Sequence, residues 1–151
     1  VVSDPGIKRQ NILAPVIFDQ FPGCGPLGAL HAALSSCNTT YLATIPCDMP
    51  LLNVEFYRIL IRNISNPLPV VACSEMGMEP VLAIWPRSAL PIITSLLKKK
   101  CLSLRFALGQ FDARTIFMPD HLHPYDPAVF LNINTRGDYV LARELTLLKA
   151  I

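Results

Sequence analysis

The chain has 151 residues, enough for one domain with a buried core, and 52% of them are hydrophobic whereas only 16% are charged. This balance excludes a disordered chain and suits an α/β domain whose central strands are covered on both faces. Thirteen basic against eleven acidic residues give a formal net charge of +2. That excludes the concentrated basic surface of a nucleic-acid-binding protein but leaves room for a small anionic ligand.

The five cysteines are odd in number and form no CxxC pair. They therefore argue against a zinc site or a disulfide framework and favour reduced thiols. No apolar run reaches the length of a membrane span, and the first residues lack the features of a signal peptide. We expect a soluble, cytoplasmic protein that binds neither nucleic acid nor a membrane.

Strands and helices alternate along the first part of the chain. The stretch APVIFDQ (14–20) is a short apolar strand stopped by an acid, and a glycine- and proline-rich turn leads from it into an apolar helix over 26–36. The next strand is 41–45, and a helix over 53–64 follows it with Asn53 as the N-cap. The apolar face of that helix is expected to carry Val54, Tyr57, Ile61 and Ile64.

Two strands come next, PVVACS (69–74) and PVLAIWP (80–86). The five residues between them, EMGME, are short enough for a hairpin or for a pair of edge strands. A helix over 87–100 follows, in which Pro91 marks either a kink or the first turn. A second short helix is expected over 102–108.

The last part of the chain begins with a strand over 113–119 and a proline-rich loop. A short extended segment, VFLNINT (129–135), then leads to a closing amphipathic helix that Thr135 caps, with Asp138 in the capping-box position. The alternation of strands and helices predicts a three-layer α/β fold with a mainly parallel sheet, in a single domain over 1–151.

Polar side chains follow three predicted strands, at the ends where such sheets bind ligands. They are Asp19, Asp48, and the pair Asn132 and Asn134. A lone carboxylate at Asp48 can hold a nucleotide-bound Mg²⁺, because Mg²⁺ is commonly bound by one or two carboxylates plus substrate phosphates. Alternatively, Asp48 accepts backbone N–H bonds in a turn between its two prolines. For Asp19, a turn acid or helix cap is the simpler interpretation.

The stretch GCGPLG (23–28) brings glycines and backbone N–H groups to the start of a helix, a surface suited to a nucleotide or a phosphate. No Lys follows it, so it is not the GxxxxGK[ST] loop of another class of nucleotide-binding protein. A tight turn into a helix is the simpler interpretation of this stretch alone.

Four stretches taken together resemble, in order and spacing, the molybdenum cofactor guanylyltransferases and, more broadly, the small-molecule nucleotidyltransferases. They are GPLGALHAAL, YLATIPCDMPLL, EPVLAIWP and FLNINTRGDYVLARE. The resemblance covers most of the chain from Asp19 to Arg143. It implies a Rossmann-like nucleotidyltransferase fold that transfers a guanylyl group from GTP to molybdopterin carrying its molybdenum. The products would be the guanine dinucleotide cofactor and pyrophosphate.

The resemblance also implies roles for residues that contact the nucleotide. Asp48 matches the catalytic acid that binds Mg²⁺, and Asp19 matches an acid that contacts the nucleotide. The nucleotide turn matches Gly25, Pro26, Leu27 and Gly28, where the family more often reads GPLAG and this chain reads GPLGA. A further nucleotide-contacting residue falls at Ser3 or Asp4.

The acceptor side is implied in the same way. Asn132 and Asn134 match amides on the side where the pterin is expected, and the implied partners are GTP, molybdenum-molybdopterin, and molybdoenzymes or their chaperones. Glu79 stands where many relatives carry a His, and the sequence leaves its role open. Two kinds of alternative function remain. The first is a cytidylyltransferase or another small-molecule nucleotidyltransferase of this fold, and the second is a non-catalytic relative that binds the cofactor.

Family members begin with a strand and a glycine-rich LAGGxSxRMGxDK-like loop whose backbone and Lys hold the triphosphate. This sequence contains no such stretch. We therefore expect an N-terminally incomplete chain in which the first strand of the sheet is missing, with a genuine short protein as the alternative.

Overall fold

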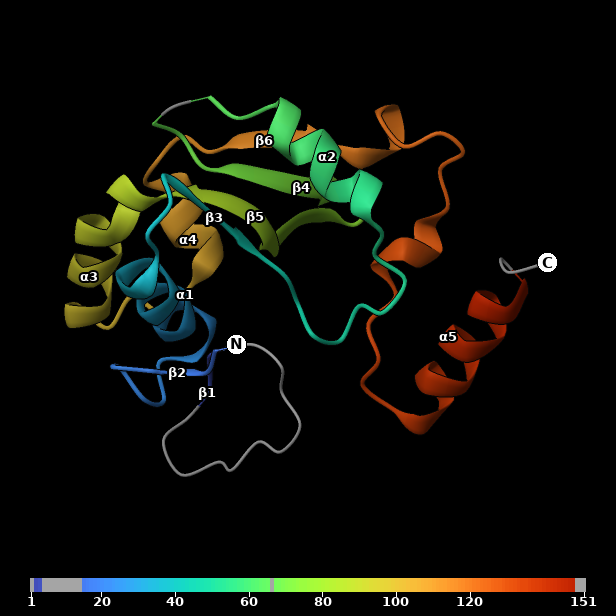
Figure 1. The fold of residues 1–151 in the computed structure, drawn as a ribbon, viewed down its shortest axis with the longest axis horizontal. Helices are drawn as coiled ribbons and strands as arrows, with labels where there is room; N and C mark the ends of the chain where they lie inside the picture. The colour runs from blue at the N-terminus through green and yellow to red at the C-terminus, as the bar shows by residue number, and fades with distance from the viewer. Residues whose placement is uncertain (1, 4–14, 66, 149–151) are drawn as a thin grey trace.

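The computed structural model describes residues 2–3, 15–65 and 67–148 (Figure 1). Four of the strands form one sheet, and β3 lies at one edge and β6 at the other. In spatial order they are β3 (Tyr41–Thr44), β5 (Gly77–Pro86), β4 (Val70–Ser74) and β6 (Arg114–Phe117). A separate parallel pair is formed by β1 (Val2–Ser3) and β2 (Ile17–Phe18).

The four-stranded sheet is mixed, whereas the sequence led us to expect a mainly parallel one. β5 is antiparallel to both β3 and β4, and only β4 and β6 are parallel neighbours. Alternation of strands and helices does not apply to β4 and β5, because a short turn joins them into the hairpin that was one of the two expected arrangements. β3, β4 and β6 nevertheless run in one direction, so their carboxyl ends share one edge of the sheet.

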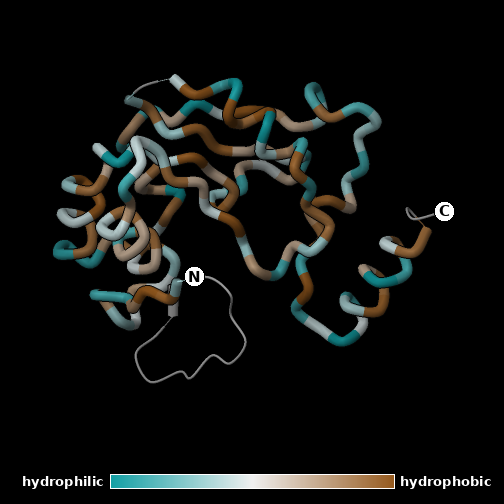
Figure 2. The backbone as a smooth tube through the Cα atoms, viewed as in Figure 1, coloured by the Kyte–Doolittle hydropathy of each residue, from teal (hydrophilic) through white to brown (hydrophobic). Residues whose placement is uncertain are grey.

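Helices cover both faces of the sheet and form two cores. Side chains alternate along a strand, so Val71 enters one core and its neighbours Val70 and Ala72 enter the other. The first core surrounds Trp85 and includes α1 (Gly25–Ser36), α3 (Leu90–Lys98) and α4 (Leu104–Gly109). The second core surrounds Phe56 of α2 (Val54–Arg62). Figure 2 shows the hydrophobic segments that run along the strands between these helices.

Three helix starts follow the local signals of the sequence. The Asn53 side chain accepts a hydrogen bond from the Phe56 N–H at 3.1 Å, so it caps α2. Pro91 lies in the first turn of α3, where its missing N–H costs nothing. At the start of α5 (Arg136–Leu148), the Thr135 hydroxyl accepts from the Asp138 N–H at 3.2 Å and the Asp138 carboxylate accepts from the Thr135 N–H at 2.8 Å.

The capping box also affects the acid that forms it. Hydrogen bonds from Thr135 and from the Asn134 N–H hold the pKa of Asp138 below its ordinary value.

Short 3₁₀ turns complete the described helices: η1 (Arg87–Ala89), η2 (Met118–Asp120) and η3 (Pro127–Phe130). Among all the helices described here, none is long and apolar enough to cross a bilayer.

The segment expected to be extended over 129–135 is not a strand. Its first residues end η3, and the chain then runs without regular secondary structure to the cap of α5. The reason is local, because Pro127 opens a turn in which the Asp126 side chain accepts a hydrogen bond from the Ala128 N–H at 2.9 Å.

The buried face of α2 differs in part from the expected one. Of the four expected residues, Tyr57 and Ile64 pack against the core, whereas Val54 and Ile61 are 66% and 54% exposed. The buried residues of the helix are Phe56, Ile59 and Leu60. Both sets satisfy helical spacing, since apolar residues occur on more than one side of VEFYRILIR. The sheet and the loop around Val129 decide which side is covered.

A matched pair of isoleucines tests this assignment. Ile59→Ala should lower the free energy of unfolding by about 2–4 kcal/mol, because it leaves a cavity in the core. Ile61→Ala removes the same atoms from an exposed position and should change it by less than about 1 kcal/mol. Urea unfolding followed by circular dichroism measures both, and equal losses would contradict the assigned face.

Candidate functional site

Asp48 lies in the turn that follows β3, at the edge of the sheet where the parallel strands end. Its backbone carbonyl accepts a hydrogen bond from the Ile133 N–H at 2.8 Å. The segment between η3 and α5 therefore lies against the Asp48 turn, and Figure 1 shows these two parts of the chain meeting beside the sheet. Asn132 and Asn134, which flank Ile133, are brought to the same place as Asp48.

The polar side chains of this group are open to a ligand. Among the described residues, no hydrogen bond is made to the Asp48 carboxylate or by the side-chain amides of Asn132 and Asn134. Asp48 is half-buried, and the turn around it does not use its carboxylate as an acceptor of backbone N–H groups. This arrangement favours a ligand role for Asp48 over a turn role.

Asp19 is held differently, because it forms the turn that follows β2. Asp19 is only 8% exposed, and its carboxylate accepts a hydrogen bond from the Phe21 N–H at 2.7 Å. It also packs against α1, where a Cβ built on Gly28 would lie 2.6 Å from Oδ2 of Asp19 and 2.9 Å from the Phe21 carbonyl. The order GPLGA therefore has a structural reason here, because residue 28 must be Gly to fit against Asp19.

The turn before α1 uses glycine where the backbone requires it. Gly23 and Gly25 have φ angles of +79° and +60°, a region that side chains disfavour. Pro26 lies in the first turn of the helix, and the Leu27 side chain is fully buried in the core. Leu27 therefore has only its backbone available to a ligand.

His31, to which the sequence analysis assigned no role, lies one turn further along α1. It is 6% exposed, its ring stands edge-on to Phe21 with centroids 4.8 Å apart, and its Nδ1 has no hydrogen-bond partner among the described residues. Burial lowers the pKa of His31, and the nearby Asp19 carboxylate opposes this shift. The i, i+3 spacing of Gly28 and His31 puts them on one face of α1, and only the structure shows that this face meets Asp19.

The predicted residues thus form two groups. Asp48 lies with Asn132 and Asn134, whereas Asp19 lies with the α1 turn and His31; the hydrogen bonds of the described residues do not join the groups. Ser3 pairs with Phe18, directly before Asp19, and Asp4 lies outside the described residues.

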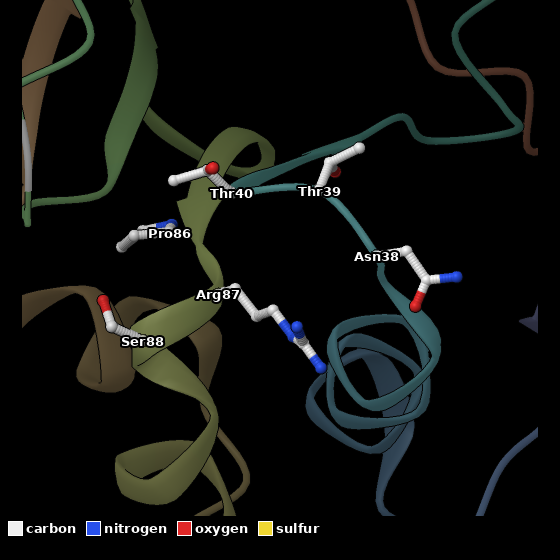
Figure 3. Close-up of a pocket in the computed structure, with 6 residues that line it drawn as sticks. All are labelled: Asn38, Thr39, Thr40, Pro86, Arg87 and Ser88. Atoms are coloured by element: carbon white, nitrogen blue, oxygen red, sulfur yellow. The ribbon is translucent and has the colours of Figure 1, made fainter.

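A pocket of about 340 Å³ lies elsewhere, between the start of β3 and the end of β5. Its lining residues are Asn38, Thr39, Thr40, Pro86, Arg87 and Ser88 (Figure 3). Arg87 points toward the end of α1, where a cation is favoured by the helix dipole. The pocket is at the amino end of β3, away from Asp48, and it contains none of the predicted site residues.

Comparison with known families settles the class of the protein. Residues 1–114 match the family described as the MobA-like NTP transferase domain. The chain belongs to this family. MobA-like NTP transferases are nucleotidyltransferases, so the general class predicted from the sequence is confirmed.

Several relatives carry the name probable molybdenum cofactor guanylyltransferase. The protein from Halalkalibacterium halodurans is 30% identical over 91% of this MobA-like chain and 73% of its own length. The relative from Methanocaldococcus jannaschii is 30% identical over 80% and 61%, and that from Bacillus subtilis is 26% identical over 83% and 63%. The chain thus spans less than two thirds of the latter two relatives.

Solved structures support the fold. Molybdopterin-guanine dinucleotide biosynthesis protein A from Archaeoglobus fulgidus has a TM-score of 0.74 at 23% identity, with 88% of this chain and 68% of that chain covered. A putative protein from Aquifex aeolicus has a TM-score of 0.71 at 23% identity, with 82% and 63% covered. The α/β nucleotidyltransferase fold of this MobA-like chain is therefore shared with both.

The contact between Asp19 and α1 predicts a cost for any side chain at position 28. Gly28→Ala should lower the free energy of unfolding by about 1–3 kcal/mol, because the new methyl group meets a carboxylate and a backbone carbonyl. Gly109→Ala is the control, since a Cβ there has open space, and it should change stability by less than about 1 kcal/mol. Urea unfolding of both variants checks the difference.

Burial of His31 predicts a pH dependence of stability. Its folded pKa lies below the ordinary value of 6.5, so the unfolded chain binds the proton more readily and stability falls as the pH drops below about 6.5. His31→Leu should reduce the loss of stability between pH 7 and pH 5. His121→Gln, at an exposed position, should leave that loss unchanged. Thermal unfolding at both pH values measures this loss, and an equal loss in wild type and His31→Leu would refute the assignment.

Proposed function

We propose that this chain, as one nucleotidyltransferase-like domain, takes part in transfer of a guanylyl group from GTP to molybdenum-molybdopterin, with release of pyrophosphate. Membership of the MobA-like NTP transferase family supports the reaction class. The names of relatives that are about 30% identical support the pair of substrates.

The hydrogen bond from Ile133 N–H to the Asp48 carbonyl is the observation that carries the proposal. This bond joins the backbone of the Asp48 turn to the segment that contains Asn132 and Asn134, at the edge where α/β sheets bind ligands. Among the described residues, none makes a hydrogen bond to the Asp48 carboxylate or to the side-chain amides of these two asparagines. In our proposal Asp48 is the nucleotide and metal side of this group, and Asn132 and Asn134 face the pterin.

The residues at Asp48 fit Mg²⁺, which prefers oxygen ligands and commonly keeps water and substrate phosphates as further ligands. Within the described part of the chain, no three His, Cys, Asp or Glu side chains cluster in a way that would hold an ion without substrate. Asp48 would therefore hold the ion together with the triphosphate. When bound, Mg²⁺ would neutralise charge on the phosphates and on the leaving pyrophosphate.

The chain's own groups act by position. A terminal phosphate oxygen of molybdopterin attacks the α-phosphorus of GTP, the new P–O bond forms, and the bond to the β-phosphate breaks. This displacement needs no protein nucleophile, so the exposed Cys47 beside Asp48 has no covalent role. Asp19 and the N-terminus of α1, with Gly25, Pro26 and Leu27, would contact the nucleotide.

A variant of Asp48 tests the proposal. Asp48→Asn keeps the shape of the side chain but removes its charge, and should lower kcat/KM for pyrophosphate release from GTP by about 100-fold and raise the Mg²⁺ requirement. Asp112→Asn is the control, because Asp112 is exposed and its positive φ suits Asn equally well. The assay contains molybdenum-molybdopterin and compares GTP with CTP.

The outcomes separate the candidate functions. Pyrophosphate release from GTP but not from CTP supports the proposal, and pyrophosphate release from CTP but not from GTP makes the protein a cytidylyltransferase. Binding of molybdopterin without release from either nucleotide would indicate a non-catalytic relative. Unchanged turnover and Mg²⁺ dependence in Asp48→Asn would remove the metal assignment.

A further inference from the structure

β5 contains an irregularity next to the edge where Asp48 lies. Along the β4–β5 ladder, Val71 pairs with Ala83, but Cys73 pairs with Met78. The single residue between Val71 and Cys73 on β4 is thus opposite residues 79–82 of β5. Bulges of this kind re-aim side chains and are over-represented beside active sites.

Side chains from two other elements hold the bulge. The Thr44 hydroxyl of β3 bonds to the Val81 carbonyl at 2.7 Å and lies 3.1 Å from the Ala83 carbonyl. On the other side, Arg105 of α4 donates to the Met78 carbonyl at 2.9 Å. Pro80, inside the bulge, has no N–H to lose from the ladder. The Met78 and Val81 carbonyls at the bulge therefore both accept hydrogen bonds from side chains of neighbouring elements.

The bulge carries Glu79, whose side chain is fixed by a buried hydroxyl. Ser74 is 4% exposed, and its hydroxyl accepts from the Met76 N–H at 3.1 Å. The single hydroxyl proton has two acceptors, Oε1 of Glu79 at 2.8 Å and the Gly77 carbonyl at 3.2 Å, and the shorter bond to the carboxylate is the stronger one. No hydrogen bond to Oε2 of Glu79 is made by any residue in the described part of the chain. Since each carboxylate oxygen has two lone pairs, the outer side of the carboxylate can still accept two donors.

Glu79 and Asp48 lie on the same edge of the sheet. The β3–β5 ladder ends with Thr44 opposite Ala83. Asp48 is four residues beyond Thr44 (48 − 44), and Glu79 is four residues before Ala83 (83 − 79), so both chains leave the ladder toward the same side. The start of β5 is therefore beside the carboxyl ends of β3 and β4.

We propose that Glu79, held by Ser74 on the β5 bulge, recognises the 2-amino-4-oxopyrimidine edge of a substrate. This edge presents a ring N–H beside an amino group, and two parallel N–H donors match the two oxygens of a carboxylate. Guanine and pterin both carry it, so the inference rests on the proposed function, in which both are substrates. Glu79 is a specificity residue in this proposal and takes no part in the displacement at phosphorus.

Binding measurements on the purified chain distinguish the two sources. Pterin is compared with lumazine, which has oxygen in place of the 2-amino group, and GTP is compared with ITP, which lacks that group. Calorimetry and pterin fluorescence give the dissociation constants without turnover. In wild type, either pterin or GTP should bind at least about 10-fold more tightly than its analogue, because the analogue loses one charge-assisted hydrogen bond.

Three variants locate the preference. Glu79→Gln and Glu79→Asp should both reduce it to less than about 2-fold, because the first replaces an acceptor by a donor and the second withdraws the carboxylate. Glu75→Gln, in the same hairpin but exposed, should retain it. Discrimination confined to pterin and lumazine assigns Glu79 to the acceptor, and discrimination confined to GTP and ITP assigns it to the nucleotide.

Failure of this inference is distinct from failure of the proposed function. The inference is overturned if wild type discriminates neither pair, or if Glu79→Gln retains the preference with a native circular dichroism spectrum. It is also overturned if Glu79→Gln changes only the Mg²⁺ requirement, because Glu79 would then be a metal ligand. If the chain prefers an amino ligand to its analogue but releases no pyrophosphate, the role of Glu79 is supported and only the guanylyltransferase function is contradicted.

Discussion

β5 lies between β3 and β4 and pairs with both, and the arrangement of the site depends on this position. Its buried residues supply both cores, with Ala83 and Trp85 on one face and Leu82 and Ile84 on the other. Because β5 runs against its neighbours, its first residues meet their last ones. One antiparallel strand therefore brings a hairpin to the same edge as the strand ends of an α/β sheet, where ligands bind.

That edge collects groups from distant parts of the chain. The turn after β3 supplies Asp48, the segment before α5 reaches it through Ile133, and the bulge of β5 adds Glu79. Asp48 and Glu79 are half-buried residues, and charged groups interact more strongly with a ligand at such positions than at fully exposed ones. A second set, around Asp19 and His31, is buried against α1 and is held by close packing.

The described residues also leave two surfaces uncovered. β3 is an edge strand of the four-stranded sheet, and only Ala142 of α5 is buried. Leu147 and Leu148 are exposed, and Figure 1 shows α5 standing apart from the sheet. The roles given to individual site residues remain predictions.

Local signals in the sequence were sufficient for the starts of α2 and α5. Asn53, Thr135 and Asp138 cap helices through hydrogen bonds to residues three or four positions away. Such caps can therefore be predicted from the local sequence. The acids and amides after apolar runs were found in the same way. The family was recognised from the order of four motifs, which needs no coordinates.

Only the tertiary structure decided how these pieces meet. The covered face of α2 depends on the sheet beneath it, since two faces of the helix have apolar residues at helical spacing. The place of β5 inside a mixed sheet, the contact of Ile133 with Asp48, and the burial of His31 against Phe21 join residues that are separated along the chain. Such pairings are set by packing and by satisfaction of buried polar groups, which one-dimensional spacing does not record.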